Sequence, residues 1–180
     1  FLFIILFVGF VVWIFSFFVL FYGPDNSASR TLHWCFTALS VALLTSTGLV
    51  ERDDVWIYVT EIVLFFFYMF TVSGFFFFST IFPFAEKGRM ILRKLVIFVP
   101  SNILVILILY FRLSSIYNIS LGDFVTYQSL FALFHITLFI FIGGAIFNFI
   151  YAYRQAELNA DRIKIKWILW GLITGSLPFL

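Results

Sequence analysis

The chain has 180 residues, of which 63% are hydrophobic, 23% aromatic and 11% charged. Soluble domains carry roughly 25% charged residues and about 45–50% apolar ones, so a soluble fold could not cover this much apolar surface. The formal net charge of +2 is too small to indicate nucleic-acid binding. We therefore expect the lipid bilayer to be the main partner of the chain, and no nucleic acid.

Apolar runs of transmembrane length follow one another along the chain. About 20 apolar residues cross a bilayer core of roughly 30 Å as a helix. The runs do not alternate between apolar and polar residues, as strands of a membrane barrel do. The sequence therefore predicts an all-α fold, a polytopic transmembrane helix bundle that forms a single domain over residues 1–180. Five complete spans and a truncated sixth are expected, at residues 1–22, 31–50, 55–82, 95–111, 124–153 and 167–180.

The two chain ends favour a piece of a longer polypeptide. The chain begins with Phe1 instead of Met and stops at Leu180 within an apolar run. The first run is too long for the apolar part of a signal peptide and has no basic segment before it.

Polarity differs between the second and third runs. Hydroxyl groups of Ser40, Thr45 and Ser46 need hydrogen-bond partners in hydrocarbon, so we expect the second helix to be central and shielded from lipid. The Phe-rich third helix is expected to have a broad lipid-facing side.

Basic residues are distributed unevenly over the connections between runs. Nine of the 11 Lys and Arg residues lie in the first, third and fifth connections, whereas the second and fourth contain only Arg52 and Arg112. Positively charged connections stay on the cytoplasmic side. The sequence predicts a multi-pass protein with residues 85–94 and 154–166 in the cytoplasm and Phe1 outside. Residues 52–54 and 114–123 would then be external.

Polar residues at membrane depth are the candidates for function. Glu61 is the one acid inside a predicted run and lies about 9 Å from the start of its helix, and His135 lies about 16 Å along the fifth. Tyr127 and Gln128 are at a height similar to Glu61. These four residues form the predicted ligand or coupling site, with His135 at its floor, if the third and fifth helices touch. The alternative is separate packing contacts between helices.

Known catalytic and cofactor motifs are missing from the sequence. We find no P-loop, nucleophile elbow, zinc-protease motif or dinucleotide fingerprint. The single cysteine, Cys35, lies in an apolar run, where a buried and unreactive thiol is expected. We expect no catalytic residue, no cofactor and no metal site in these residues.

Two stretches of sequence share a pattern with a known family. An aromatic run ends in Phe-Pro, and a later basic segment enters an apolar run through a Lys-Trp-x-x-Trp-Gly sequence and a Gly-x-x-Pro sequence. The residues are Phe82, Pro83, Arg162, Lys166, Trp167, Trp170, Gly171, Gly175 and Pro178. This pattern resembles the N-terminal multi-helix transmembrane sensor module of bacterial sensor histidine kinases and related membrane-anchored signalling proteins. That family often has a His near its Phe-Pro end, which this chain lacks, so no ligand site is transferred.

The resemblance implies a membrane-embedded signal-input domain in a bacterial cytoplasmic membrane. It would detect an unknown signal ligand or peptide and pass the signal to a cytoplasmic output domain beyond Leu180. The parent protein would be a histidine kinase or a related two-component protein, and a homodimer through its cytoplasmic part would fit. One alternative is a fragment of a membrane transporter or of a lipid-handling membrane enzyme. A purely structural anchor is another.

Overall fold

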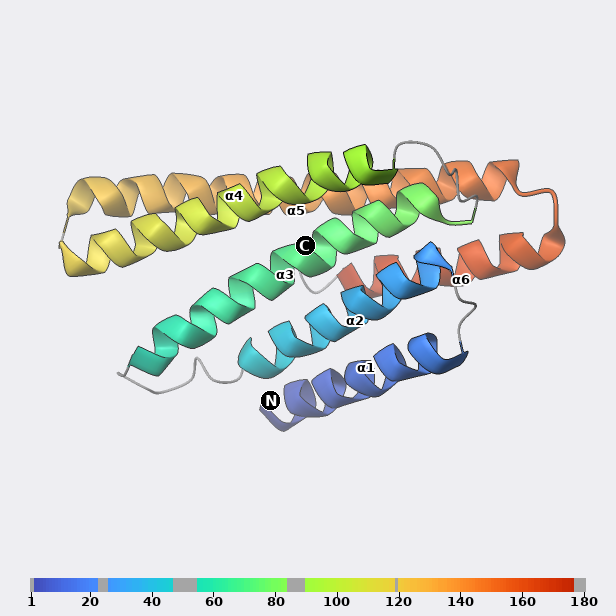
Figure 1. The fold of residues 1–180 in the computed structure, drawn as a ribbon, viewed down its shortest axis with the longest axis horizontal. Helices are drawn as coiled ribbons and strands as arrows, with labels where there is room; N and C mark the ends of the chain where they lie inside the picture. The colour runs from blue at the N-terminus through green and yellow to red at the C-terminus, as the bar shows by residue number, and fades with distance from the viewer. Residues whose placement is uncertain (1, 23–25, 47–54, 84–89, 119, 177–180) are drawn as a thin grey trace.

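The chain folds into long α-helices with short connections (Figure 1). The computed structural model describes residues 2–22, 26–46, 55–83, 90–118 and 120–176, and within these ranges it contains helices and no strand. The prediction of an all-helical chain is therefore confirmed for the described residues. The helices are α1 Leu2–Tyr22, α2 Ser27–Ser46, α3 Val55–Ile81, α4 Met90–Tyr117, α5 Leu121–Gln155 and α6 Asn159–Ser176.

Among the described residues, four helices are long and apolar enough to cross a membrane. The candidate spans are Phe3–Tyr22, Tyr58–Ile81, Met90–Tyr117 and Leu121–Gln155. Helix α2 is not among them because Ser, Thr, His and Arg interrupt its apolar residues, and α6 begins with a charged segment. A lipid bilayer is the environment that suits the large exposed apolar surfaces of these helices.

Several helices extend beyond the predicted runs. Helix α4 begins five residues before and ends six residues after the run 95–111, and Pro100 lies inside it. Helix α6 begins at Asn159, so most of the predicted connection 154–166 is helical, as are residues 114–117 and 121–123 of the connection 114–123. The apolar run marks the part of a helix in hydrocarbon, but backbone hydrogen bonds continue the helix into the interface.

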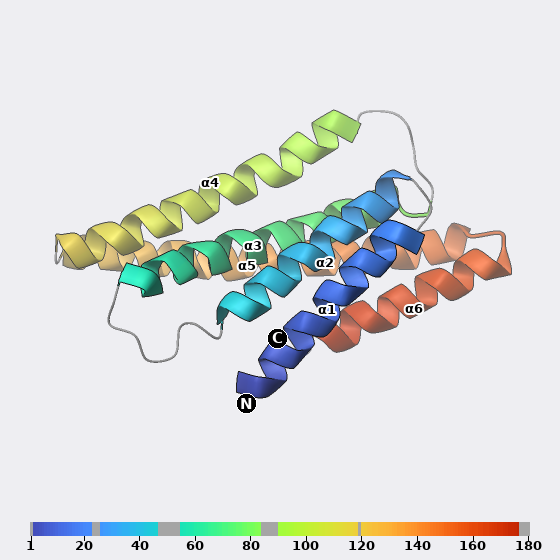
Figure 2. The same cartoon turned by 60° about the horizontal axis from the view of Figure 1, so that its bottom comes forward.

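The helices alternate in direction, so their ends form two groups (Figures 1 and 2). One group, here called the basic end, contains the ends of α1, α3 and α5 and the starts of α2, α4 and α6. Arg112 of α4 lies toward the opposite end. The other described basic side chains lie within about three turns of the basic end: Arg30, Arg93, Lys94, Arg154, Arg162, Lys164 and Lys166.

Helix α3 is the central helix of the bundle. It packs against α2, α4 and α5, whereas α1 packs on α2 and α6 packs on α5. Met69, Phe77 and Phe78 of α3 each belong to a different cluster of buried apolar side chains. The expectation of a broad lipid-facing side on the third helix is therefore wrong. Phe suits both lipid and a packed core, so its abundance could not distinguish them.

Helix α2 has a buried face made of small residues. Cys35, Ala38, Ser40 and Ala42 are buried, and the Ser40 hydroxyl donates a 2.8 Å hydrogen bond to the Gly9 carbonyl of α1. Small residues and hydroxyl groups at helix contacts are typical of membrane bundles. Helix α2 is thus enclosed between α1 and α3, although Trp34 and Leu44 remain exposed.

Candidate functional site

An ion pair joins α3 and α4 toward the end of the bundle opposite the basic end. Glu61 Oε1 lies 3.4 Å from Arg112 Nε, and the two side chains are 14% and 35% exposed, respectively. An unpaired charge in a low-dielectric environment is costly, and the opposite charges of these two groups offset part of that cost. The pair joins two different helices, whereas the ion pair of Lys164 with Asp161 lies within α6.

Tyr127 of α5 adds a third helix to this charged group. The guanidinium carbon of Arg112 lies 5.3 Å from the centre of the Tyr127 ring, a distance typical of a cation–π contact. Glu61, Arg112 and Tyr127, here called the polar triad, therefore connect α3, α4 and α5. Glu61 and Tyr127 were predicted to lie at similar heights. Arg112 was missed because it follows the apolar run and was assigned to a connection.

Hydrogen bonds hold the adjoining ends of α4 and α5 together. The Ser114 hydroxyl donates to Asp123 Oδ2 at 2.7 Å, and the Asn118 side chain donates to Ser114 Oγ at 3.0 Å. Ser120 is the N-cap of α5, and its hydroxyl accepts from the backbone N–H of Asp123. These contacts fix α5 relative to α4 and so fix the height of Tyr127 beside Arg112.

Gln128 and His135 lie outside the polar triad. Both side chains are exposed on α5. His135 Nδ1 lies 2.8 Å from the carbonyl oxygen of Phe131 on its own helix, and its ring packs edge-to-face on the Phe131 ring. Among the described residues, no hydrogen bond or ion pair joins His135 to Glu61. Helices α3 and α5 do touch, but through Phe65, Phe131 and Phe134 at this height.

The described residues of the family-like pattern lie at the end of α3 and along α6. Phe82 follows α3 and its ring packs against Phe78 and Phe149, while Pro83 is the last described residue before α4. The Arg162 guanidinium donates to the Ala156 carbonyl at 2.8 Å, which fixes the start of α6. Lys166, Trp167, Trp170 and Gly171 are exposed, Gly175 lies within α6, and Pro178 lies outside the described residues.

A second polar cluster joins α1 to α2. The buried Ser16 hydroxyl lies 2.7 Å from His33 Nδ1 and 2.6 Å from Thr37 Oγ1, and His33 Nδ1 also lies 2.9 Å from the Ser16 carbonyl. Depending on the tautomer, Nδ1 either donates to the Ser16 carbonyl or accepts from the Ser16 hydroxyl, and both contacts run between the same two helices. The cluster therefore joins α1 to α2. His33 was not among the residues predicted to form a site.

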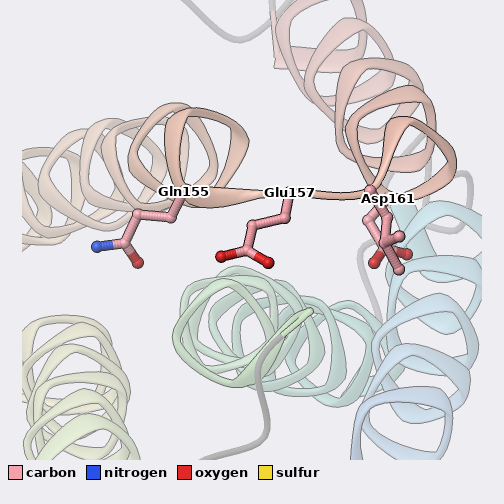
Figure 3. A pocket seen from close by; sticks show the side chains of 4 residues that line it. Gln155, Glu157 and Asp161 are labelled. Atoms are coloured by element: carbon pink, nitrogen blue, oxygen red, sulfur yellow. The ribbon is translucent and has the colours of Figure 1, made fainter.

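A polar hollow of about 540 Å³ lies beside the connection between α5 and α6. Its lining includes Gln155 at the end of α5, Glu157 in the connection and Asp161 in the first turn of α6, whose side chains extend to the same side (Figure 3). Asp161 is paired with Lys164 at 3.2 Å. Within the described part of the chain, no three His, Cys, Asp or Glu side chains come close enough together to hold a metal ion. The hollow is therefore not a metal cage.

Comparisons with known proteins give no relative for this chain: no family model, no curated protein and no solved structure matches it. Its function is accordingly argued from its own residues and their geometry.

Proposed function

We propose that the chain is a membrane-embedded signal-input domain of a bacterial sensor kinase-like protein. In this proposal it receives a signal within the bilayer and passes it to a cytoplasmic output part beyond Leu180. Three features support it: a helical bundle with large exposed apolar surfaces, a charged group that connects three of its helices, and the sensor-like residues around Lys166 and Trp167.

The proposal includes a complete membrane topology. Helices α1 to α5 would each cross the bilayer, and α6 would begin a sixth crossing. The basic end would face the cytoplasm, because cytoplasmic segments are enriched in Lys and Arg. Phe1 and the polar triad would then lie toward the outer face of a bacterial cytoplasmic membrane.

The polar triad is the observation that carries the proposal. An ion pair in an apolar environment has two distinct states, paired and separated, and any ligand that competes for either partner shifts that balance. Glu61 belongs to the central helix α3, so a change in the pair would move the helix that contacts α2, α4 and α5. The buried cluster around Phe78, Phe149 and Ile165 connects that movement to α6.

The experiment measures the output of the full-length protein in its native membrane, as autophosphorylation. We expect Glu61→Gln and Arg112→Gln each to change output about fivefold or more, because each leaves one charge without its partner. The matched controls are Glu157→Gln and Arg154→Gln, which remove the same charges from exposed positions at the basic end.

A charge swap separates loss of the pair from loss of the fold. The double variant Glu61→Arg with Arg112→Glu keeps one acid and one base on facing helices, so we expect output nearer to that of the native protein than in either single variant. Native output from both neutral variants at normal expression would contradict the proposed role of the pair.

A transporter is the second candidate, and it has less support. Transporters place their substrates at helices that are broken near the membrane midplane. In the described residues α3 and α5 run without a break, and α4 continues through Pro100.

A further inference from the structure

An apolar cavity of about 470 Å³ lies among α2, α3, α5 and α6. Its size falls within the range of about 300–1,000 Å³ that is usual for small-ligand sites. The hydroxyl of Thr71, which is in its wall, donates to the Phe67 carbonyl of its own helix. The wall is otherwise almost entirely hydrocarbon and aromatic, and includes Leu32, Phe36, Phe75, Phe141, Phe149 and Trp167.

A second cavity, of about 420 Å³, lies at the basic end and is here called the rim cavity. One part of its wall consists of polar groups from the start of α2 and the start of α6, namely Asn26, Ser27, Ser29, Asp161 and Lys164. The rest is apolar and includes Phe78, Ile81 and Phe82. Lys164 Nζ lies 3.2 Å from Asp161 Oδ1, so one positive and one negative group stand together in its wall.

The two cavities adjoin. Leu32 of α2 and Ile168 of α6 line both of them. On one side of these two shared residues the wall contains charged and hydroxyl groups, and on the other side it is apolar. This order of polarity matches that of a lipid molecule, with its headgroup at the membrane interface and its chain in hydrocarbon.

The bilayer itself can supply such a molecule. Trp167, in the wall of the apolar cavity, is 74% exposed, and Gly171 in the same wall is also exposed. The cavity thus reaches the apolar outer surface of α6. On the opposite side, the buried residues Ala145 and Phe149 of α5 close the cavity.

We propose that these adjoining cavities bind a single-chain amphiphile with a zwitterionic headgroup, of the lysophosphatidylethanolamine type. The alkyl chain occupies the apolar cavity beside Phe36 and Phe75. In the rim cavity the ammonium group faces Asp161 and the phosphate faces Lys164. Each member of this ion pair then also contacts a lipid group of opposite charge. The inference concerns binding alone and is independent of signal output and of the Glu61–Arg112 pair.

The test uses the full-length protein in nanodiscs with a lysophosphatidylethanolamine that carries a photoactivatable diazirine on its chain. We expect labelled peptides from the α2 and α6 cavity walls, and loss of that label when unlabelled lysophosphatidylethanolamine competes. A fatty acid without the headgroup should compete about tenfold more weakly.

Two pairs of variants locate the site. Ile142→Phe enlarges a side chain in the apolar cavity and should weaken labelling about tenfold, whereas Ile150→Phe, the same change on an exposed part of α5, should not. Lys164→Gln should weaken competition by the zwitterionic lipid, whereas the exposed Lys166→Gln should not. Should Ile142→Phe fail to fold, Leu39→Phe tests the cavity from α2.

Three results would overturn the proposal. One is labelling of the outer faces of α1 and α4 that no competitor reduces, because such labelling shows that the probe occupies bulk lipid only. Another is equal labelling of folded Ile142→Phe and Ile150→Phe. Equal competition by the fatty acid would show that the rim cavity does not recognise a headgroup.

Discussion

Gly74 lies where α3 crosses α2 at van der Waals distance. A Cβ atom built on Gly74 would lie 2.5 Å from the sulfur of the buried Cys35. Ordinary contacts between such atoms are about 3.5–4.0 Å, so a side chain fits at this position only if the Cys35 side chain or the helices move. The Cys35 sulfur therefore occupies the space that a side chain at position 74 would need, and Cys35 serves as a packing residue.

We predict that Gly74→Ala lowers the free energy of unfolding by about 1–3 kcal/mol, the usual effect of overpacking a core. Unfolding in mixed micelles of detergent and denaturant would measure it. Gly143→Ala is the matched control, because nothing lies within 4 Å of a Cβ atom there. Adding Cys35→Ala to Gly74→Ala removes the clashing sulfur and should restore much of the loss. Equal stability of Gly74→Ala and Gly143→Ala would refute this contact.

At the scale of residues, some side chains of the candidate site could be predicted from the sequence and others could not. Glu61 was recognisable because an acid in an apolar run needs a partner. Its partner Arg112 was not recognisable, because Arg112 follows the end of an apolar run. It lies beside Glu61 only because helix α4 continues past that run. His135 was selected for its depth alone, and depth along a helix does not say which face a side chain occupies.

At the scale of helices, α1 is held to the bundle through α2. Most of the side chains of α1 are exposed, and its interior contacts depend on Gly9 and Ser16. In lipid no hydrophobic driving force brings apolar side chains of two helices together, so close packing and hydrogen bonds between α1 and α2 account for their association.

We predict that Ser16→Ala weakens the contact between α1 and α2 by about 0.6 kcal/mol, and by no more than about 1.7, as measured for hydrogen bonds between membrane helices. The loss is limited because His33 Nδ1 keeps the Ser16 carbonyl as an acceptor. Disulfide cross-linking between cysteines introduced into α1 and α2 would measure the association. Ser129→Ala is the control, since that hydroxyl bonds only to a carbonyl of its own helix. A larger loss in the control would contradict the role given to Ser16.

The order of the helices was largely predictable and their packing was not. Apolar runs of about 20 residues gave the position of every helix, because a backbone in lipid must satisfy its own hydrogen bonds. The runs did not give the ends of α4 and α6, whose helices continue through charged residues. Nor did they identify α3 as central, because in the sequence a buried Phe such as Phe77 or Phe78 cannot be distinguished from a Phe that faces lipid.

At the scale of the whole molecule, charge distinguishes the two ends of the bundle. The described basic residues gather at the basic end, with Arg112 paired to Glu61 toward the other. The account of the chain as a membrane bundle requires these ends to lie on opposite sides of a bilayer, with the basic end in the cytoplasm.

Cysteine labelling with an impermeant thiol reagent tests that requirement most directly. Cys35→Ala provides the background, with single cysteines at Asn118, between α4 and α5, or at Leu158, between α5 and α6. The account predicts that Asn118→Cys reacts in intact cells and that Leu158→Cys reacts only after the membrane is permeabilised. Reaction of Leu158→Cys in intact cells, with or without reaction of Asn118→Cys, would contradict it.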